Sequence, residues 1–380
     1  MENDIRYESF RLYSGKGAIT SPRNLLFSNN GIVAYRTKLI YALLDKKVEK
    51  IIAPFTWYIL DTFQYMERFN EELTNDIRNG ITIKGEPHPE RADELEKIFS
   101  EGFGEPILKK IWPNLKCIVA GGSGDFRIYT DQLKRYSGDI PYTEGYYAAS
   151  EGIFAAYDEE NKKFRMRTDS NFYEFREIGE DGSEGEVCSI DGLKEGLRYE
   201  LIITNNSGFY RYPLRDVILV DHIDGSSLIF DVLYRRSDEV ILPEGKGVLM
   251  PDAIRDAVLE LIGRMDLPVG DYSYTVSDDE KFLELYLEQR GYGSERLTSF
   301  DREDIARAFD ELLRTKCNSY GSIRSAGFEE CRVFYVEEET QAAYREIGVE
   351  RSHLAPDQMK PIRYIDNPVK KKFISTFLIR

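Results

Sequence analysis

The stretch Tyr147-Ala148-Ala149-Ser150-Glu151-Gly152 is the part of the chain that says most about its fold. It places an aromatic ring, a hydroxyl group and a carboxylate within five residues. An adenine ring needs a flat apolar or aromatic wall, and Mg²⁺ takes oxygen ligands from only one or two carboxylates. The stretch can therefore contact both ends of one nucleotide. Taken alone, the pattern also fits a strand end that Ser150 and Glu151 cap before a turn.

A second polar stretch, Gly208-Phe209-Tyr210-Arg211-Tyr212-Pro213-Leu214-Arg215-Asp216, follows downstream. A carboxylate at the start of a strand can accept two hydrogen bonds from the hydroxyl groups of a ribose, and hydrogen bonds to charged groups are strong. Asp216 is the candidate for this contact. The alternative is an ion pair of Asp216 with Arg211 or Arg215 that only holds the turn.

The composition is that of a globular protein with room for two or more domains. The chain has 380 residues, of which 42% are hydrophobic, and a net charge of −16. This charge argues against a nucleic-acid partner, and no apolar stretch is long enough to cross a membrane. We expect free thiols and a cytoplasmic location, because the start of the chain lacks a signal-like pattern and the cysteines are widely spaced. The cysteines are Cys117, Cys188, Cys317 and Cys331.

The apolar spacing before Tyr147 predicts helices interleaved with buried strands. Helices are expected over residues 31–46, 61–79 and 90–100, and strands over 51–55 and 115–120. After Tyr147 the pattern changes to strands rich in β-branched and aromatic residues. These strands are expected over residues 163–167, 172–177, 198–204, 217–220 and 228–234. The chain is therefore predicted to be an α/β protein with mixed sheets flanked by helices and an added antiparallel region.

A smaller α+β unit is expected to begin near Ser237, which divides the chain into domains 1–236 and 237–380. Its helices are expected over 252–265, 302–316 and 340–347, and its strands over 272–276, 282–288 and 332–336. The basic run Lys370-Lys371-Lys372 is interpreted as a solvated strand end.

The order and context of these stretches resemble the auxin-responsive acyl-acid amido synthetase family, known as Gretchen Hagen 3, of the acyl-adenylate-forming superfamily. The resemblance extends over about residues 10 to 380, with a short first half, as in a divergent member of bacterial type. Three upstream segments are similar to the family as well: Pro89 to Leu95, Ile111 to Leu115 and the glycine-rich Gly121 to Tyr129.

The resemblance implies roles for single residues. In the family's Tyr-x-x-Ser-Glu motif the aromatic and hydroxyl residues line the adenine pocket, so Tyr147 and Ser150 are expected there, with Gly122 nearby. The glutamate approaches Mg²⁺, which corresponds to Glu151. Asp216 ends the second family motif, Gly-Leu-Tyr-Arg-Tyr-Arg-x-Gly-Asp, and is expected to bind ribose. Pro213 and Arg215 depart from this motif, because Pro213 replaces its arginine and Arg215 its glycine.

Two later segments also resemble the family. In Tyr234 to Ile241, Arg236 corresponds to an arginine that reaches the ribose or phosphates, and Asp238 corresponds to a hinge residue. The alternative is a charged strand end before a linker. In Gln358-Met359-Lys360-Pro361-Ile362-Arg363, Lys360 corresponds to the catalytic cation that a mobile domain carries. The alternative there is a surface lysine before a terminal strand.

The phosphate-binding loop is expected near the N-terminus, in Tyr13 to Arg23. Such a loop holds phosphates with backbone N–H groups and hydroxyls. The candidates are Ser14, Gly15, Thr20 and Ser21. Arg23 stands where the superfamily has a lysine, and the loop is not a Walker loop.

The resemblance therefore implies an enzyme that uses ATP and Mg²⁺ to activate a small carboxylic acid as an acyl-adenylate. An amine or amino acid then attacks it to give an amide. Two alternatives stay open: a nucleotide- or acid-binding relative with impaired catalysis, and an enzyme that passes the acyl group to a thiol. The sequence leaves the oligomeric state open.

Overall fold

The computed structural model describes residues 20–21, 31–80, 85–225, 227–242, 245–352 and 359–379. By its internal contacts the chain divides into two compact units. The first unit comprises Met1–Ala120, Tyr129–Tyr142 and Glu346–Met359, and the second comprises Gly121–Ile128, Thr143–Arg345 and Lys360–Arg380. The domain boundary expected at residue 237 falls inside the second unit and stays a prediction.

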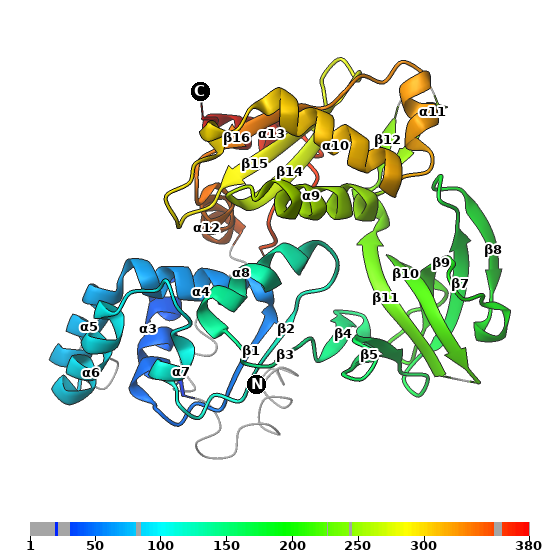
Figure 1. The fold of residues 1–380 in the computed structure, drawn as a ribbon. Coiled ribbons are helices and arrows are strands. Elements are labelled where there is room, and N and C mark those ends of the chain that lie inside the picture. Colours follow the sequence, from blue (N-terminus) through cyan, green and yellow to red (C-terminus); the bar gives the residue numbers. More distant parts are fainter. Residues whose placement is uncertain are drawn as a thin grey trace. The chain divides into compact units, whose positions relative to one another are not determined.

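The first unit combines helices with a three-stranded sheet in the order β1-β2-β3 (Figure 1). The strands are β1 (Lys50–Phe55), β2 (Cys117–Gly121) and β3 (Tyr142–Thr143). The helices are α3 (Gly31–Leu44), α4 (Thr56–Arg68), α5 (Asn70–Asn79), α6 (Pro89–Ser100), α7 (Leu108–Ile111) and α8 (Arg127–Ser137).

The single helix expected over residues 61–79 is two helices. Phe69 ends α4 and begins α5 with φ −114° and ψ 27°, outside the helical region. The apolar spacing predicted one continuous helix because apolar residues on both sides of Phe69 are buried. They are Phe63, Met66, Leu73 and Ile77. A helical period on both sides of a break looks continuous in the sequence.

An eight-stranded sheet, in the order β4-β5-β6-β11-β10-β9-β7-β8, forms much of the second unit. Its strands are β4 (Tyr146–Ala149), β5 (Gly152–Asp158), β6 (Lys163–Met166), β7 (Phe172–Ile178), β8 (Glu184–Cys188), β9 (Arg198–Thr204), β10 (Tyr212–Asp224) and β11 (Ser227–Arg235). The neighbouring pairs are antiparallel. Aliphatic and aromatic side chains together form its core, and the aromatic ones include Phe154, Phe164, Phe175 and Phe230.

A smaller sheet, in the order β14-β15-β16, lies in the same unit. β14 (Val269–Val276) is antiparallel to β15 (Leu283–Gln289), and β15 is parallel to β16 (Arg332–Val336). Helices α9 (Pro251–Met265) and α10 (Arg302–Lys316) pack together, and α10 also packs on β16 (Figure 1). The remaining elements are β12 (Val240–Leu242), β13 (Gly247–Leu249), α11 (Tyr320–Ser325), α12 (Thr340–Ser352) and α13 (Pro368–Thr376).

The basic run at 370–372 lies in helix α13, so the expected strand end is wrong. The Asn367 side chain accepts hydrogen bonds from the N–H groups of Val369 and Lys370, and Pro368 occupies the first turn. An asparagine cap followed by proline is a helix start, and this signal outweighs the β-like residues around it.

Cys117, Cys188, Cys317 and Cys331 are all free thiols, as expected. None of the helices in the described ranges is both long and apolar enough to cross a membrane.

Candidate active site

Tyr147 and Asp216 form the centre of the candidate site. Tyr147 lies on β4, and its hydroxyl donates a hydrogen bond of 2.6 Å to Oδ2 of Asp216 on β10. The ring of Tyr147 packs against Phe154 and Phe164, with centroid distances of 5.3 and 6.0 Å. Burial and the Asp216 charge raise the pKa of Tyr147 well above its usual value, so the phenol stays protonated and donates.

The chain reaches Asp216 through an irregular turn. The pairing of β10 with β9 shifts register between Pro213 and Val217, and Arg215 has a φ of +62°. This is the left-handed region, which glycine adopts without cost and arginine does not. Arg215 stands where the resembling family motif has glycine, so the backbone keeps a conformation that suits the replaced residue.

Asp216 faces cationic side chains from two other segments. It pairs in register with Arg235 of β11, whose Nε lies 3.8 Å from Oδ1 of Asp216. Burial raises the pKa of Asp216, whereas the Tyr147 hydrogen bond and the charges of Arg235 and Lys360 lower it. The exposed Lys360 also lies with its Nζ 5.9 Å from the ring centroid of Phe126.

The positive charge of Lys360 also acts on two further carboxylates, those of Asp125 and Asp238. Asp125 belongs to the 3₁₀ turn η1 (Gly124–Phe126), and Asp238 belongs to η3 (Arg236–Asp238). Protein atoms crowd both groups, and this burial raises the pKa of each, while Lys360 acts in the opposite direction on both. Their negative charge is costly where it lies, and a nearby cation offsets part of that cost.

The Ser150–Glu151 corner adjoins this cluster. The charge of Glu151 contributes to raising the pKa of Asp216, and its backbone carbonyl accepts a 3.1 Å hydrogen bond from Nδ2 of Asn205. Ser150 is exposed. Over the described ranges, no group of three or more His, Cys, Asp or Glu residues could hold a metal ion. The expected contact of Glu151 with Mg²⁺ stays a prediction.

The backbone N–H groups of Gly122 and Ser123 point to a side chain within the same unit. They donate hydrogen bonds of 3.2 and 2.9 Å to Oε2 of Glu144. Burial raises the pKa of Glu144, and these two donors act against that shift. The glycine-rich turn is therefore held in shape, and the nucleotide contact of Gly122 stays a prediction.

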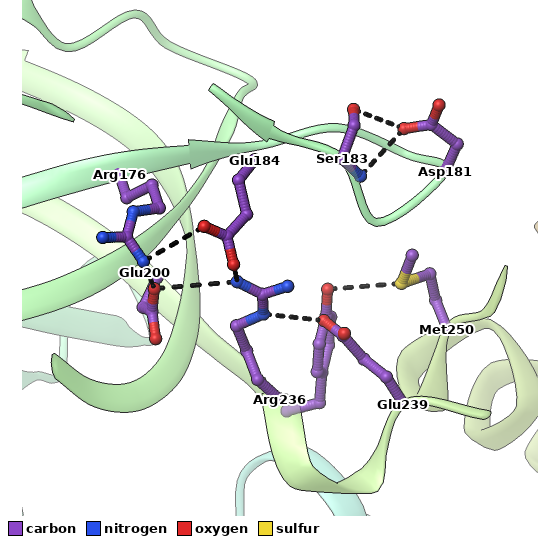
Figure 2. A network of polar contacts seen from close by, with 9 residues as sticks. Arg176, Asp181, Ser183, Glu184, Glu200, Arg236, Glu239 and Met250 are labelled. Carbon is purple, nitrogen blue, oxygen red and sulfur yellow. Dashed lines mark hydrogen bonds and ion pairs between the residues drawn. The ribbon is translucent and has the colours of Figure 1, made fainter. Parts of the chain in front are cut away.

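Arg236 is engaged with three carboxylates, two on strands β8 and β9 of the large sheet and one directly after η3 (Figure 2). Its Nη1 lies 2.6 Å from Oε1 of Glu184 and 3.7 Å from Oε2 of Glu200, and its Nε lies 3.2 Å from Oε1 of Glu239. Arg176 joins the same network through Glu184 and Glu200. The expected contact of Arg236 with ribose or phosphates stays a prediction, while its neighbour Arg235 faces Asp216.

Of the four phosphate-loop candidates, the structure describes Thr20 and Ser21. Ser14 and Gly15 lie outside the described residues. Thr20 and Ser21 form a half-buried bend of the first unit. Their role in phosphate binding stays a prediction.

Sequence reasoning missed two residues of this cluster, Arg235 and Asp125. Arg235 could have been found by counting outward from the Asp224–Ser227 turn pair of the β10–β11 hairpin, which sets Asp216 opposite Arg235. Asp125 gave no comparable signal, because its neighbours come from distant segments.

Two family domains match this chain. Residues 2–142 match the GH3 family N-terminal domain, and residues 164–235 match the GH3 family central domain. The chain belongs to the GH3 family. This confirms the resemblance drawn from the Tyr147 and Asp216 motifs.

Similar GH3 proteins come from plants. The "4-substituted benzoates-glutamate ligase GH3.12" of Arabidopsis thaliana is 26% identical over 222 residues, which cover 53% of this chain and 38% of the relative. The "Putative indole-3-acetic acid-amido synthetase GH3.9" of Arabidopsis thaliana is 28% identical over 261 residues, which cover 60% of this chain and 45% of the relative. The match thus spans less than half the length of these GH3 relatives.

A solved GH3 structure confirms the fold. The "GH3.15 acyl acid amido synthetase" aligns with a TM-score of 0.83 and 21% identity, covering 96% of this chain and 70% of that one. The α/β fold predicted from the sequence, with mixed sheets, flanking helices and a smaller α+β part, is therefore correct.

Proposed function

We propose that this GH3 chain uses ATP to activate a small carboxylic acid as an acyl-adenylate and then joins the acyl group to an amine, such as that of an amino acid. The observation that supports the proposal is the convergence of two other segments on one carboxylate, Asp216. Tyr147 of the Tyr-x-x-Ser-Glu motif donates a hydrogen bond to it, and the charges of Glu151, from the same motif, and of Lys360, from the later segment, act on it. The names of the GH3 relatives favour an aromatic or indole acid and an amino acid as substrates.

The first step needs positioning and charge neutralisation rather than a protein nucleophile. A carboxylate oxygen of the acid attacks the α-phosphorus of ATP, forming an O–P bond as the bond to pyrophosphate breaks. Lys360 stabilises the negative charge that develops on the phosphate oxygens. In this proposal Asp216 accepts hydrogen bonds from the ribose hydroxyls, while Tyr147 and Ser150 bound the adenine side.

The second step forms the amide. The amine nitrogen attacks the acyl carbon, AMP leaves with the electrons of the C–O bond, and the nitrogen gives its extra proton to water. AMP is a good leaving group, so orientation supplies much of the remaining rate.

Glu151 is the proposed protein ligand of Mg²⁺. A single carboxylate fits this ion, which usually keeps waters and takes its other ligands from the nucleotide phosphates. The bound ion would supply neutralisation of phosphate charge. A cytoplasmic setting is also part of the proposal, and the four free thiols support it.

The proposal is tested by carboxylate-dependent exchange of labelled pyrophosphate into ATP, over a panel of aryl, indole and aliphatic acids. We expect exchange with at least one acid, and its loss in Glu151→Ala. The matched control is Glu160→Ala, which removes an exposed carboxylate from the β5–β6 turn, at the opposite end of β5 from Glu151. Equal exchange in wild type and Glu151→Ala would contradict the role of Glu151. Product analysis with amino acids and with coenzyme A then separates amide from thioester formation.

A second candidate is a GH3 relative that binds the nucleotide without catalysing adenylation. The observation that favours it is the engagement of Arg236 with Glu184, Glu200 and Glu239, which occupies an arginine expected to reach the nucleotide. Calorimetric binding of ATP without exchange over the whole acid panel would support this candidate against the first.

A further inference from the structure

The segment that follows Lys360 is fixed to the edge of β14. Tyr274 N donates to the carbonyl of Arg363 at 2.8 Å, and Ile365 N donates to the carbonyl of Tyr274 at 2.9 Å. The buried side chain of Gln341 adds two hydrogen bonds to the backbone of Ile362, at 2.8 and 3.2 Å. Lys360 is therefore attached to the smaller sheet through the segment that follows it.

Arg363 anchors this segment through a buried ion pair. Its side chain is 6% exposed, and its Nη1 bonds to Oδ1 of Asp271 at 2.5 Å and to the carbonyl of Tyr272. The guanidinium also lies over the ring of Tyr272, 4.2 Å from its centroid. All three contacts are with β14, so they persist in any movement of the smaller sheet as a body.

One contact of Arg363 leaves the smaller sheet. Its Nη2 donates a 3.3 Å hydrogen bond to the backbone carbonyl of Asp125 in η1. The turn η1 packs on β11 of the large sheet, and a Cβ at Gly124 would lie 3.3 Å from the carbonyl oxygen of Leu233. Phe126 follows Asp125 in this turn, and its ring lies under Lys360. Arg363 and Lys360 thus dock onto the same three-residue turn.

We propose that Arg363 is a positioning residue that holds Lys360 in place for adenylation through its bond to the Asp125 carbonyl. This bond is released when the smaller sheet moves for the amide-forming step, whereas the bonds to Asp271 and Tyr272 are kept. The inference rests on the proposed function, because it assigns Arg363 to one of its two half-reactions.

The planar guanidinium suits this role because it can donate to both partners at once from different nitrogens. Lysine keeps the positive charge beside Asp271, but its single ammonium group cannot also reach the Asp125 carbonyl as the second guanidinium nitrogen does. Arg363→Lys should therefore leave the segment on β14 and weaken only the connection to η1. A loss that affects one half-reaction distinguishes this role from general structural support.

The experiment compares wild type with Arg363→Lys in each half-reaction separately. We expect the kcat of pyrophosphate exchange to fall by about tenfold with little change in the KM for ATP, since a hydrogen bond to a charged group is lost. Amide formation from a supplied, preformed acyl-adenylate should stay within about twofold of wild type. Equal losses in the two half-reactions, or unchanged exchange in a folded variant, would overturn the proposal.

Arg332→Lys is the matched control, because Arg332 also lies over an aromatic ring, that of Phe282, on the smaller sheet. It should leave both half-reactions unchanged. Hydrogen exchange of peptides covering 121–128 and 359–365 gives a readout that needs no catalysis: we expect faster exchange in Arg363→Lys at 121–128. If residues 121–128 were as protected in Arg363→Lys as in wild type, the proposed contact would be contradicted, whether or not the protein catalyses pyrophosphate exchange. A lack of pyrophosphate exchange in the wild type, by itself, would contradict only the proposed function.

Discussion

Tyr147 and Asp216 lie 69 positions apart in the sequence and share a hydrogen bond of 2.6 Å. The bond joins two GH3 motifs that are recognised separately in the sequence, and it lowers the pKa of the aspartate proposed to bind ribose. Burial raises the pKa of Asp216, and the Tyr147 hydroxyl is the largest influence that lowers it.

Tyr147→Phe should shift the acid limb of activity to higher pH. Without the hydroxyl the pKa of Asp216 rises further, so Asp216 becomes protonated at a higher pH and can no longer accept from ribose. The free energy of unfolding at pH 7 should fall by about 1–2 kcal/mol, because a charge is left without its donor. This loss should shrink as the pH falls through the raised pKa, since the protonated carboxyl is cheaper to bury.

Pyrophosphate exchange and urea unfolding across a pH series check the Tyr147 prediction. Tyr157→Phe is the control, because Tyr157 also packs against Phe164, at 5.5 Å, on the same sheet. An acid limb that stays in place in Tyr147→Phe would contradict the link between the two residues.

Arg215→Gly should stabilise the protein. Arg215 is exposed and has a φ of +62°, where glycine is free of the strain that a side chain causes. Glycine loses more backbone entropy on folding, so the net gain in the free energy of unfolding is expected to be about 0.5–1 kcal/mol. Arg211→Gly is the comparison: Arg211 also has a positive φ, +46°, but its Nε pairs with Glu174 at 2.9 Å, so less should be gained. A destabilised Arg215→Gly protein would contradict the strain.

Lys360→Met should remove adenylation while leaving the fold intact. The ammonium is proposed to stabilise charge on the transferring phosphate, and loss of such a group costs about 10²–10³ in kcat. Because Lys360 is exposed, the free energy of unfolding should change by less than about 0.5 kcal/mol. The control is Lys370→Met, which removes a surface lysine paired with Asp366. Similar exchange rates in the two variants would exclude the proposed role of Lys360.

Arg236→Met should destabilise the protein strongly. The side chain of Glu239 is 6% exposed and loses the charge that faces it, whereas Glu200, 3% exposed, keeps Arg176 at 3.1 Å. Removing one partner of a buried ion pair costs about 3–5 kcal/mol. Urea unfolding measures this loss. A stable Arg236→Met protein that fails only in pyrophosphate exchange would show instead that Arg236 acts on the nucleotide.

The sequence indicated most strands and helices because their apolar spacing is local. The prediction failed at Phe69, where two helices carry the same apolar spacing and look like one. It also failed at Asn367, which begins a helix in a basic segment whose residues favour strands. In the site, the resemblance named Tyr147 and Asp216, which the structure joins by a hydrogen bond, while the roles of these residues and of Glu151 and Lys360 stay predictions. Arg363 could not be assigned to Asp271 and Asp125 in this way, because those contacts join positions 92 and 238 residues apart.

The aromatic ring beneath Lys360 offers an optical probe of the site. The chain has two tryptophans, Trp57 and Trp112, and both are buried in the first unit. A third indole introduced by Phe126→Trp would occupy the position over which the ammonium lies, and tryptophan attracts cations more strongly than phenylalanine does. Its fluorescence would respond to the approach and departure of Lys360, so each half-reaction could be followed in real time without a labelled substrate.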